Sequence, residues 1–203
     1  MRKKEFYFVL LLFTIIITAN WLVRKDARLI AISILFVILY VLFYGTEIVT
    51  AYYLYLADRS FKKCDDSKAV NYYWKVHQIA PGKITRTASL AIIKNIEGKW
   101  DEAEKLYREV LRSRPNDIRL QYNLAVTLIN KGCYDEARTI LILLTHLYPR
   151  LYYHHATLGE VLMRQGRYEE AYRHLSMALR INSSETNIRN KLEAVVSKLK
   201  DER

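Results

Sequence analysis

Cysteine, proline and glycine are scarce in this chain of 203 residues, which contains two Cys, three Pro and six Gly. The two cysteines, Cys64 and Cys133, lie 69 residues apart, so they form neither a closely spaced metal-binding pair nor a disulfide framework. A small secreted fold held together by disulfides is therefore excluded. The low Gly and Pro content, together with 51% hydrophobic residues, also excludes a collagen-like or largely disordered chain.

Charged residues are rare in the first 57 positions, which hold nine of the 53 Asp, Glu, Lys and Arg residues. Residues 6–23 are uncharged, and as a helix they would extend about 27 Å, close to the thickness of a bilayer core. A second apolar stretch follows after residues 24–28. The sequence therefore predicts a transmembrane hairpin over residues 1–49, with spans at about 6–23 and 29–47. A cleaved signal peptide is the alternative for the first stretch, but the second apolar stretch follows it at once.

The positions of the cations predict which way this hairpin faces, because Lys and Arg near membrane ends are retained on the cytoplasmic side. Six cations flank the two ends of the hairpin and three lie in its turn. The six are Arg2, Lys3, Lys4, Arg59, Lys62 and Lys63, and the three are Arg24, Lys25 and Arg28. We therefore expect a multi-pass protein of the cell (inner or plasma) membrane, with both termini and the following domain in the cytoplasm.

Prolines, glycines and alanines recur along the rest of the chain with a period of 34 residues. The recurring positions are Pro81, Pro115 and Pro149, Gly98, Gly132 and Gly166, and Ala69, Ala103, Ala137 and Ala171. This pattern resembles the tetratricopeptide repeat, a helix-turn-helix unit of the same length. Independently of the family, Gly suits the left-handed turn that ends a helix, and Ala lets two helices approach closely.

The resemblance implies an all-α fold, in which a superhelix of four helix-turn-helix repeats follows the hairpin. The predicted repeats cover residues 50–83, 84–117, 118–151 and 152–185, which together form the repeat domain 50–185. The first repeat is divergent, because Cys64 stands where the others have a turn glycine. No Pro or Ser-rich stretch precedes it, so we expect the second apolar helix to run directly into repeat one. Residues 186–203 carry an apolar stripe on a polar segment, which predicts a C-terminal capping helix.

The resemblance also implies a concave groove, lined by the first helix of each repeat, that binds a peptide or protein segment. The corresponding positions here are Thr85, Ser89, Ile92, Asn95, Arg119, Tyr122, Asn123, Val126, Asn130, Tyr153, Glu160 and Arg164. The implied function is a membrane-anchored scaffold or adaptor for protein–protein interaction. The alternative is an accessory or regulatory subunit of a membrane enzyme or transporter, contacted through the hairpin. The Gly-xxx-Gly pattern that favours such contacts is missing from both spans.

Residues that carry catalysis do not form a recognisable pattern, so no enzyme activity and no cofactor are expected. None of the five His has a second metal ligand at a suitable spacing on one helix face, so no metal site is expected. His174 stands where two neighbouring repeats have Leu106 and Ile140, and we interpret it as a packing residue. Beyond residue 57 there are 26 Lys and Arg among 18 Asp and Glu, interleaved along the chain, so we expect no nucleic-acid partner.

One second helix departs from the repeat pattern by being apolar on nearly all sides, at residues 139–144. Ile142 and Leu143 stand where repeat two has Arg108 and Glu109, at positions that should face outward. Two large aliphatic side chains moved from water into an interface contribute about 1.5–3 kcal/mol each. They predict an outer contact, through which the protein self-associates or docks on the hairpin or on another membrane protein.

Overall fold

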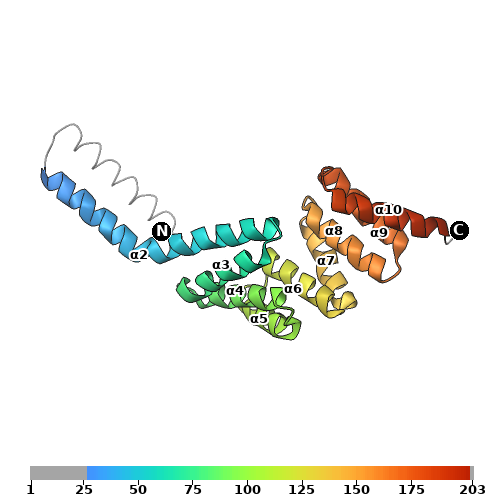
Figure 1. Cartoon of the computed structure of the whole chain (residues 1–203), viewed down its shortest axis with the longest axis horizontal. Helices are drawn as coiled ribbons and strands as arrows, with labels where there is room; N and C mark the ends of the chain where they lie inside the picture. The colour runs from blue at the N-terminus through green and yellow to red at the C-terminus, as the bar shows by residue number, and fades with distance from the viewer. Residues whose placement is uncertain (1–26, 202–203) are drawn as a thin grey trace.

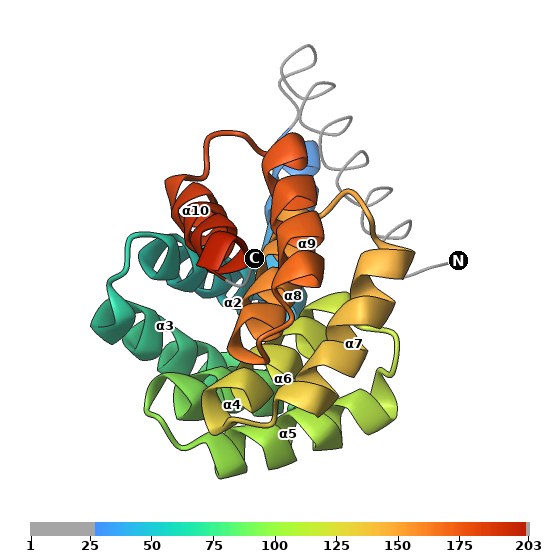
Figure 2. The same ribbon diagram turned by 90° about the vertical axis from the view of Figure 1, so that its right-hand side faces the viewer.

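The computed structural model describes the backbone of residues 27–201, and their side chains except those of residues 27–31, 33, 36, 42 and 43. The regular elements in this range are helices that follow one another along the chain (Figure 1). They are α2 Ala27–Lys62, α3 Asp66–Ile79, α4 Lys83–Ile96, α5 Trp100–Ser113, α6 Ile118–Lys131, α7 Tyr134–Leu147, α8 Tyr152–Arg164, α9 Tyr168–Ile181 and α10 Thr186–Asp201. Figure 2 shows that α3 to α8 are arranged in an arc.

The helices form antiparallel pairs, as the repeat pattern predicts. The pairs α4–α5, α6–α7 and α8–α9 make repeats two, three and four, and each helix also packs on the next one in the chain. The second half of α2 pairs with α3 as repeat one, whereas its first half projects away from the repeats (Figure 1). The prediction of an all-α helical-repeat superhelix is therefore confirmed.

The turn glycines have the backbone conformation for which the repeat needs them. Gly98, Gly132 and Gly166 have φ angles of 74°, 87° and 72°, the left-handed region that Gly enters without a Cβ penalty. In repeat one, Cys64 takes the same conformation with φ 56°. The divergent first repeat thus keeps the turn geometry and stores strain at a residue that has a Cβ.

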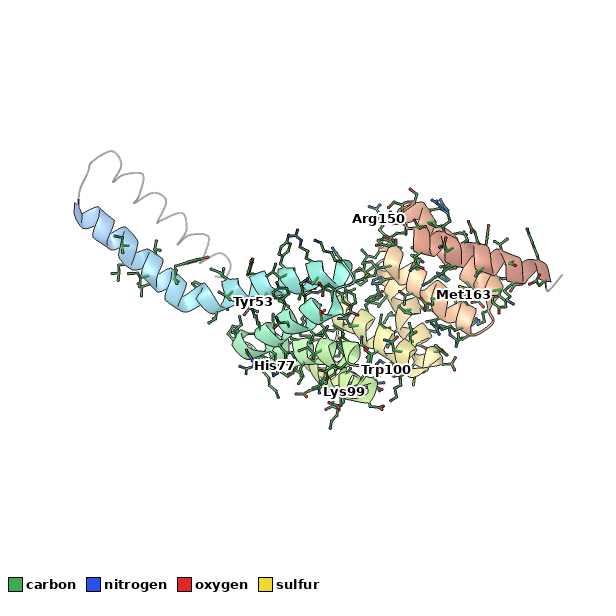
Figure 3. All side chains as sticks on the ribbon, in the orientation of Figure 1. Tyr53, His77, Lys99, Trp100, Arg150 and Met163 are labelled. Carbon is green, nitrogen blue, oxygen red and sulfur yellow. The ribbon has the colours of Figure 1, made fainter. Side chains whose placement is uncertain are left out.

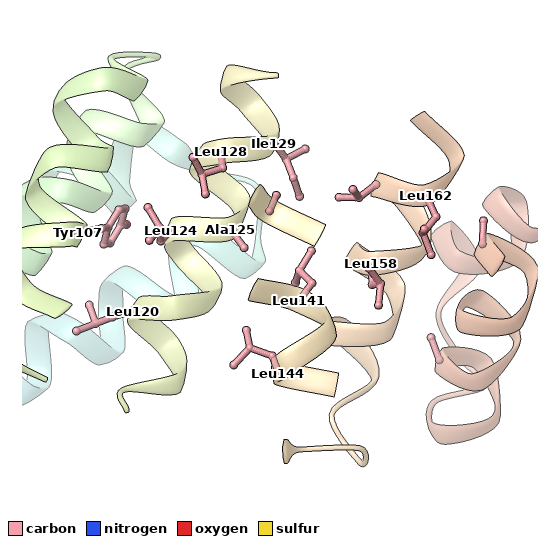
Figure 4. Packing of buried hydrophobic residues seen from close by; sticks show 14 of the residues in the cluster. Tyr107, Leu120, Leu124, Ala125, Leu128, Ile129, Leu141, Leu144, Leu158 and Leu162 are labelled. Carbon is pink, nitrogen blue, oxygen red and sulfur yellow. The ribbon is translucent and has the colours of Figure 1, made fainter. Parts of the chain in front are cut away.

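Small residues bring the two helices together in repeats two to four, which share one core with α10 (Figure 4), whereas repeat one has a smaller core of its own. Ala103, Ala137 and Ala171 are fully buried. In α8, a Cβ built on Gly159 would lie 2.7 Å from Leu175 Cγ, so only Gly fits this approach. Leu175 and its equivalent Leu141 are fully buried, and burial of such a side chain stabilises the fold by about 1.5–3 kcal/mol.

Helix α2 packs on α3 through aromatic contacts in its second half (Figure 3). The rings of Tyr53 and Tyr72 stack with centroids 6.1 Å apart, and Lys75 Nζ lies 5.0 Å from the Tyr53 centroid. Ala57 of α2 and Ala69 of α3 are fully buried where the two helices meet. The apolar helix therefore continues without a break into repeat one.

The predictions of a transmembrane hairpin and of a multi-pass location in the cell membrane are contradicted. None of the helices in the described part of the chain is long and apolar enough to cross a membrane. The predicted span 6–23 and most of the predicted turn lie outside the described residues. The predicted span 29–47 does not end as a separate element, because α2 continues to Lys62 and its second half belongs to the repeats. The predicted orientation of the termini was derived from this hairpin and therefore loses its basis.

Candidate functional site

The concave side of the repeats contains a groove of about 620 Å³, formed mainly by α2, α4 and α6. Nine of the twelve side chains predicted to face a partner line it. These nine are Thr85, Ser89, Ile92, Asn95, Arg119, Tyr122, Asn123, Val126 and Tyr153. The predicted residues of the first helices of repeats two and three therefore line the same groove.

The other three predicted residues, Asn130, Glu160 and Arg164, do not line this groove. Asn130 is exposed, and its Nδ2 lies 3.5 Å from Asn95 Oδ1. Glu160 forms ion pairs with Arg164, at 3.1 Å, and with Lys191 of α10, at 2.5 Å. Burial by itself would raise the pKa of Glu160, but the hydrogen bond and charge of Lys191 outweigh it and the pKa is lowered. The inner face of repeat four is therefore already engaged by the C-terminal helix.

Repeat one contributes groove residues that the sequence analysis missed. Leu54, Asp58 and Phe61 reach the groove from α2, and Tyr73 reaches it from α3. The Tyr73 hydroxyl donates a hydrogen bond to Asp58 Oδ1 over 2.8 Å. Burial, and then this hydrogen bond to a carboxylate, raise the pKa of Tyr73 well above its usual value. The sequence analysis assigned residues 50–83 to repeat one but named groove positions only in repeats two to four; alignment of α2 with the first helices of those repeats was the available signal.

Buried polar groups and helix caps hold the centre of the groove in place. Tyr107 is almost fully buried at the groove floor, and burial raises the pKa of its hydroxyl, an effect that a hydrogen bond with the Asn123 side chain opposes. Asp117 caps α6 by accepting hydrogen bonds from the backbone N–H groups of Arg119 and Leu120, at 3.1 and 3.2 Å. The start of α6, which presents Arg119 and Tyr122, is thus fixed by its own sequence.

Aromatic rings close the groove where α6 meets α8. The Tyr122 and Tyr153 rings are in edge contact with centroids 5.1 Å apart, and the Tyr122 hydroxyl lies 3.0 Å from Thr157 Oγ1. Behind them His154 is fully buried, with its ring centroid 4.5 Å from that of Tyr153. Neither ring nitrogen of His154 has a hydrogen-bond partner among the described residues. Burial lowers the pKa of His154 to about 4, so this wall of the groove is built on a neutral imidazole.

His155 and His174 form a hydrogen-bonded pair between α8 and α9. Their Nδ1 atoms are 3.1 Å apart, and His155 Nε2 lies 3.2 Å from the Pro149 carbonyl oxygen. Since a carbonyl only accepts, His155 donates from Nε2 and accepts at Nδ1 from His174. Burial lowers the pKa of both rings. In residues 27–201 no group of three or more His, Cys, Asp and Glu side chains is placed to hold a metal ion.

On the convex side, Ile142 and Leu143 face outward and are 50% and 48% exposed. Leu147, one turn further along α7, is 54% exposed and was not singled out in the sequence. A small hollow of about 290 Å³ adjoins this patch, between Leu143 and Leu111. The three residues Ile142, Leu143 and Leu147 are called the outer patch below.

Comparisons with known proteins identify the repeated unit. Two family models described as tetratricopeptide repeats match residues 96–156 and 152–176. The uncharacterized protein y4yS of Sinorhizobium fredii (strain NBRC 101917 / NGR234) is 34% identical over 62 residues, which are 30% of this chain and 34% of that protein. The chain therefore matches only about a third of the length of this curated relative.

Solved structures share the helix arrangement at low sequence identity. PilF of Pseudomonas aeruginosa superposes with a TM-score of 0.62 and 21% identity, over 77% of this chain and 72% of PilF. MamA RS-1 gives 0.58 and 15% identity over 75% and 86% of the two chains, and MamA AMB-1 gives 0.53 and 22% over 75% and 84%. At these identities the likeness shows the fold alone.

Proposed function

Because the chain contains tetratricopeptide repeats, we propose that it is a non-catalytic scaffold that binds a segment of a partner protein in its concave groove. The observation that carries this proposal is the groove of about 620 Å³ between α2, α4 and α6. Its volume lies in the range of ligand-binding clefts in general, which is about 300–1,000 Å³.

The lining of the groove suits a peptide because it combines an apolar floor with groups that form hydrogen bonds. Ile92 and Val126 provide aliphatic surface, and Tyr122 and Tyr153 provide aromatic surface. Asn123 is half-buried on the groove side, where an amide both donates and accepts. A peptide offers backbone N–H and C=O groups next to apolar side chains, which matches this mixture.

Site-specific photo-crosslinking from the full-length chain in its native cells tests the groove. A photoreactive residue in place of Thr85, at the groove, is compared with one in place of Lys105, which is exposed on α5 and does not line the groove. We expect a discrete crosslinked protein from position 85 and a much lower yield from position 105. Similar yields from both positions, or a product from position 105 alone, would place partner binding elsewhere.

The outer patch supports a second contact, in which two copies of the chain associate through α7. Its three aliphatic side chains are each about half exposed, whereas repeat two has Arg108 and Glu109 at the places of Ile142 and Leu143. Burial of the patch against a second copy would remove this apolar surface from water.

Sedimentation velocity of the full-length chain tests the second contact. The double variant Ile142→Arg, Leu143→Glu gives repeat three the residues of repeat two and should reduce association. Ser176→Arg, Met177→Glu makes the same change at the equivalent positions of repeat four and serves as the matched control. Identical sedimentation of both variants and the unchanged protein argues against contact through this patch.

A further inference from the structure

The charged side chains of the groove differ in whether they have hydrogen-bond partners within the fold. Two carboxylates and two guanidinium groups line it, namely those of Asp58, Asp117, Arg114 and Arg119. Asp58 accepts a hydrogen bond from the Tyr73 hydroxyl, and Asp117 accepts two from the backbone at the start of α6. Both carboxylates therefore have donors within the fold.

Both guanidinium groups lack a partner in the part of the chain that the structure describes: neither Arg114 nor Arg119 forms an ion pair or a side-chain hydrogen bond there. Other arginines, among them Arg86 and Arg112, also lack a side-chain partner in the described residues, but they do not line the groove. Four arginines of the repeats are paired with a carboxylate. These four are Arg108, Arg138, Arg164 and Arg167. The side chains of Arg114 and Arg119 are exposed where they line the groove, so their N–H donors are available to a bound molecule.

Arg119 lines the same groove as Tyr73 and Asp58. Its charge lowers the pKa of the Tyr73 hydroxyl, against the larger effect of burial. Arg114 directly follows α5, and Arg119 is the second residue of α6, so both cations lie at the junction of these two helices. The backbone at this end of α6 is capped by Asp117 and is not itself the anion site.

Apolar surface adjoins the two cations. Ile92, Val126 and Tyr122 face the same groove as Arg119, and Phe61 reaches it from α2 with 55% of its surface exposed. A bound segment must therefore carry apolar side chains and hydrogen-bond acceptors within a few residues of each other.

We infer that the groove takes a segment of a partner protein in which acidic side chains stand next to aliphatic or aromatic ones, with a carboxylate held by Arg119 and Arg114. This inference rests on the proposed groove function and specifies the chemistry of the ligand. Arg donates to a carboxylate through two parallel N–H groups, a geometry that Lys does not reproduce. The +11 net charge of the chain attracts an acidic partner over a longer range as well.

Binding of three degenerate octapeptide pools to the immobilised full-length chain tests the inference. The pools share the same Leu, Ile and Phe positions, and their remaining positions are Asp and Glu, Asn and Gln, or Lys and Arg. We expect at least tenfold more retention of the acidic pool than of the amide pool, and least of the basic pool. Retention should fall as the salt concentration rises, because the contact is between exposed charges.

Two substitutions and a matched control assign the effect to the groove. Arg119→Gln and Arg114→Gln should each lower retention of the acidic pool several-fold, and Arg119→Lys should recover only part of it. Arg112→Gln removes an exposed charge from α5 outside the groove and should retain the full effect. The three arginines changed are all exposed, and equal helix content of the four variants is checked by circular dichroism.

The outcomes separate the inference from the proposed function. Equal retention of the acidic and amide pools, with no effect of either Arg→Gln change, overturns the acidic preference but leaves the groove function intact if Asn123→Ala still lowers retention. Displacement of the acidic pool by a single-stranded twelve-nucleotide oligothymidylate also overturns it, in favour of a nucleic-acid phosphate. Absence of retention for all pools, together with no crosslink from position 85, rejects the proposed function itself.

Discussion

Acidification should destabilise the repeats through His154, which stands where repeat three has Leu120. The side chain is fully buried among the rings of Tyr122, Tyr148 and Tyr153. By distance and angle, neither of its ring nitrogens has a hydrogen-bond partner in the described structure. Burial, and then the neighbouring His155, lower the pKa of His154 from 6.5 to about 4. The Leu144 backbone raises the pKa of the ring, but by less than burial lowers it. The folded protein therefore binds a proton at this ring less readily than the unfolded chain.

The sign and size of the effect follow from this difference in pKa. The contribution of His154 to stability is complete above pH 6.5 and is lost as the pH falls toward 4, because the unfolded chain takes up the proton first. One unit of pKa corresponds to about 1.4 kcal/mol, so the loss is about 2 kcal/mol at pH 5 and about 3 kcal/mol at pH 4. His155 and His174, whose pKa values burial also lowers, add to the loss in the same direction.

The variant His154→Leu isolates this effect because it inserts the residue of the equivalent position in repeat three. It removes two unsatisfied buried nitrogens and should stabilise the fold at neutral pH by about 1–3 kcal/mol. Urea unfolding at pH 7 and pH 5, followed by helical circular dichroism, should show a smaller loss on acidification than in the unchanged protein, by about 2 kcal/mol.

The matched control is His146→Gln, a change at an exposed histidine of α7, which should retain the pH dependence of the unchanged protein. If His154→Leu loses as much stability between pH 7 and pH 5 as the unchanged protein does, the buried ring is not the group that responds, and the reasoning from its burial is wrong.

Three further substitutions test the turn, the core and the groove. Cys64→Gly should raise stability by about 0.5–1 kcal/mol, because Gly takes a φ of 56° without strain; an unchanged urea midpoint would contradict this. Gly159→Ala should lower the free energy of unfolding by about 1–3 kcal/mol, because the added Cβ would contact Leu175. A loss below about 0.5 kcal/mol, which is typical of surface substitutions, would mean that α8 and α9 move apart without cost. Asn123→Ala should weaken retention of peptides and lower the melting temperature by no more than a few degrees, because it removes one hydrogen bond to Tyr107; equal retention would exclude Asn123 from the binding surface.

The helical repeats could be predicted because each repeat marks its turns and contacts with residues that have few substitutes. A left-handed turn favours Gly, and three of the four turns have it at positions 98, 132 and 166. A close approach of two helices admits only a small side chain, which fixes Ala103 and its equivalents. Where the constraint is local in this way, the period of 34 residues is enough to place the helices.

The groove could be predicted only in part, because its limits depend on contacts between distant segments. Leu54, Asp58 and Phe61 of α2 line it, but a long helix that is apolar over most of its length gives no sign of which of its side chains face the groove. Gly45 does not end α2, since a single Gly within a helix weakens it without breaking it. The exposed Leu147 was missed for a related reason: a helix that is apolar on nearly all sides does not show which side is buried.

The C-terminal helix α10 limits how much of the concave side a partner can contact. Ile188 and Val195 of α10 are buried in the core, and Lys191 holds Glu160, which the repeat pattern assigns to the groove. A capping helix must cover the apolar face of the last repeat, and here it also satisfies that repeat's inner carboxylate. The free part of the groove therefore runs from α2 to Tyr153. In the proposed complex, the bound segment would contact repeats one to three and, at the aromatic end of the groove, Tyr153 of repeat four.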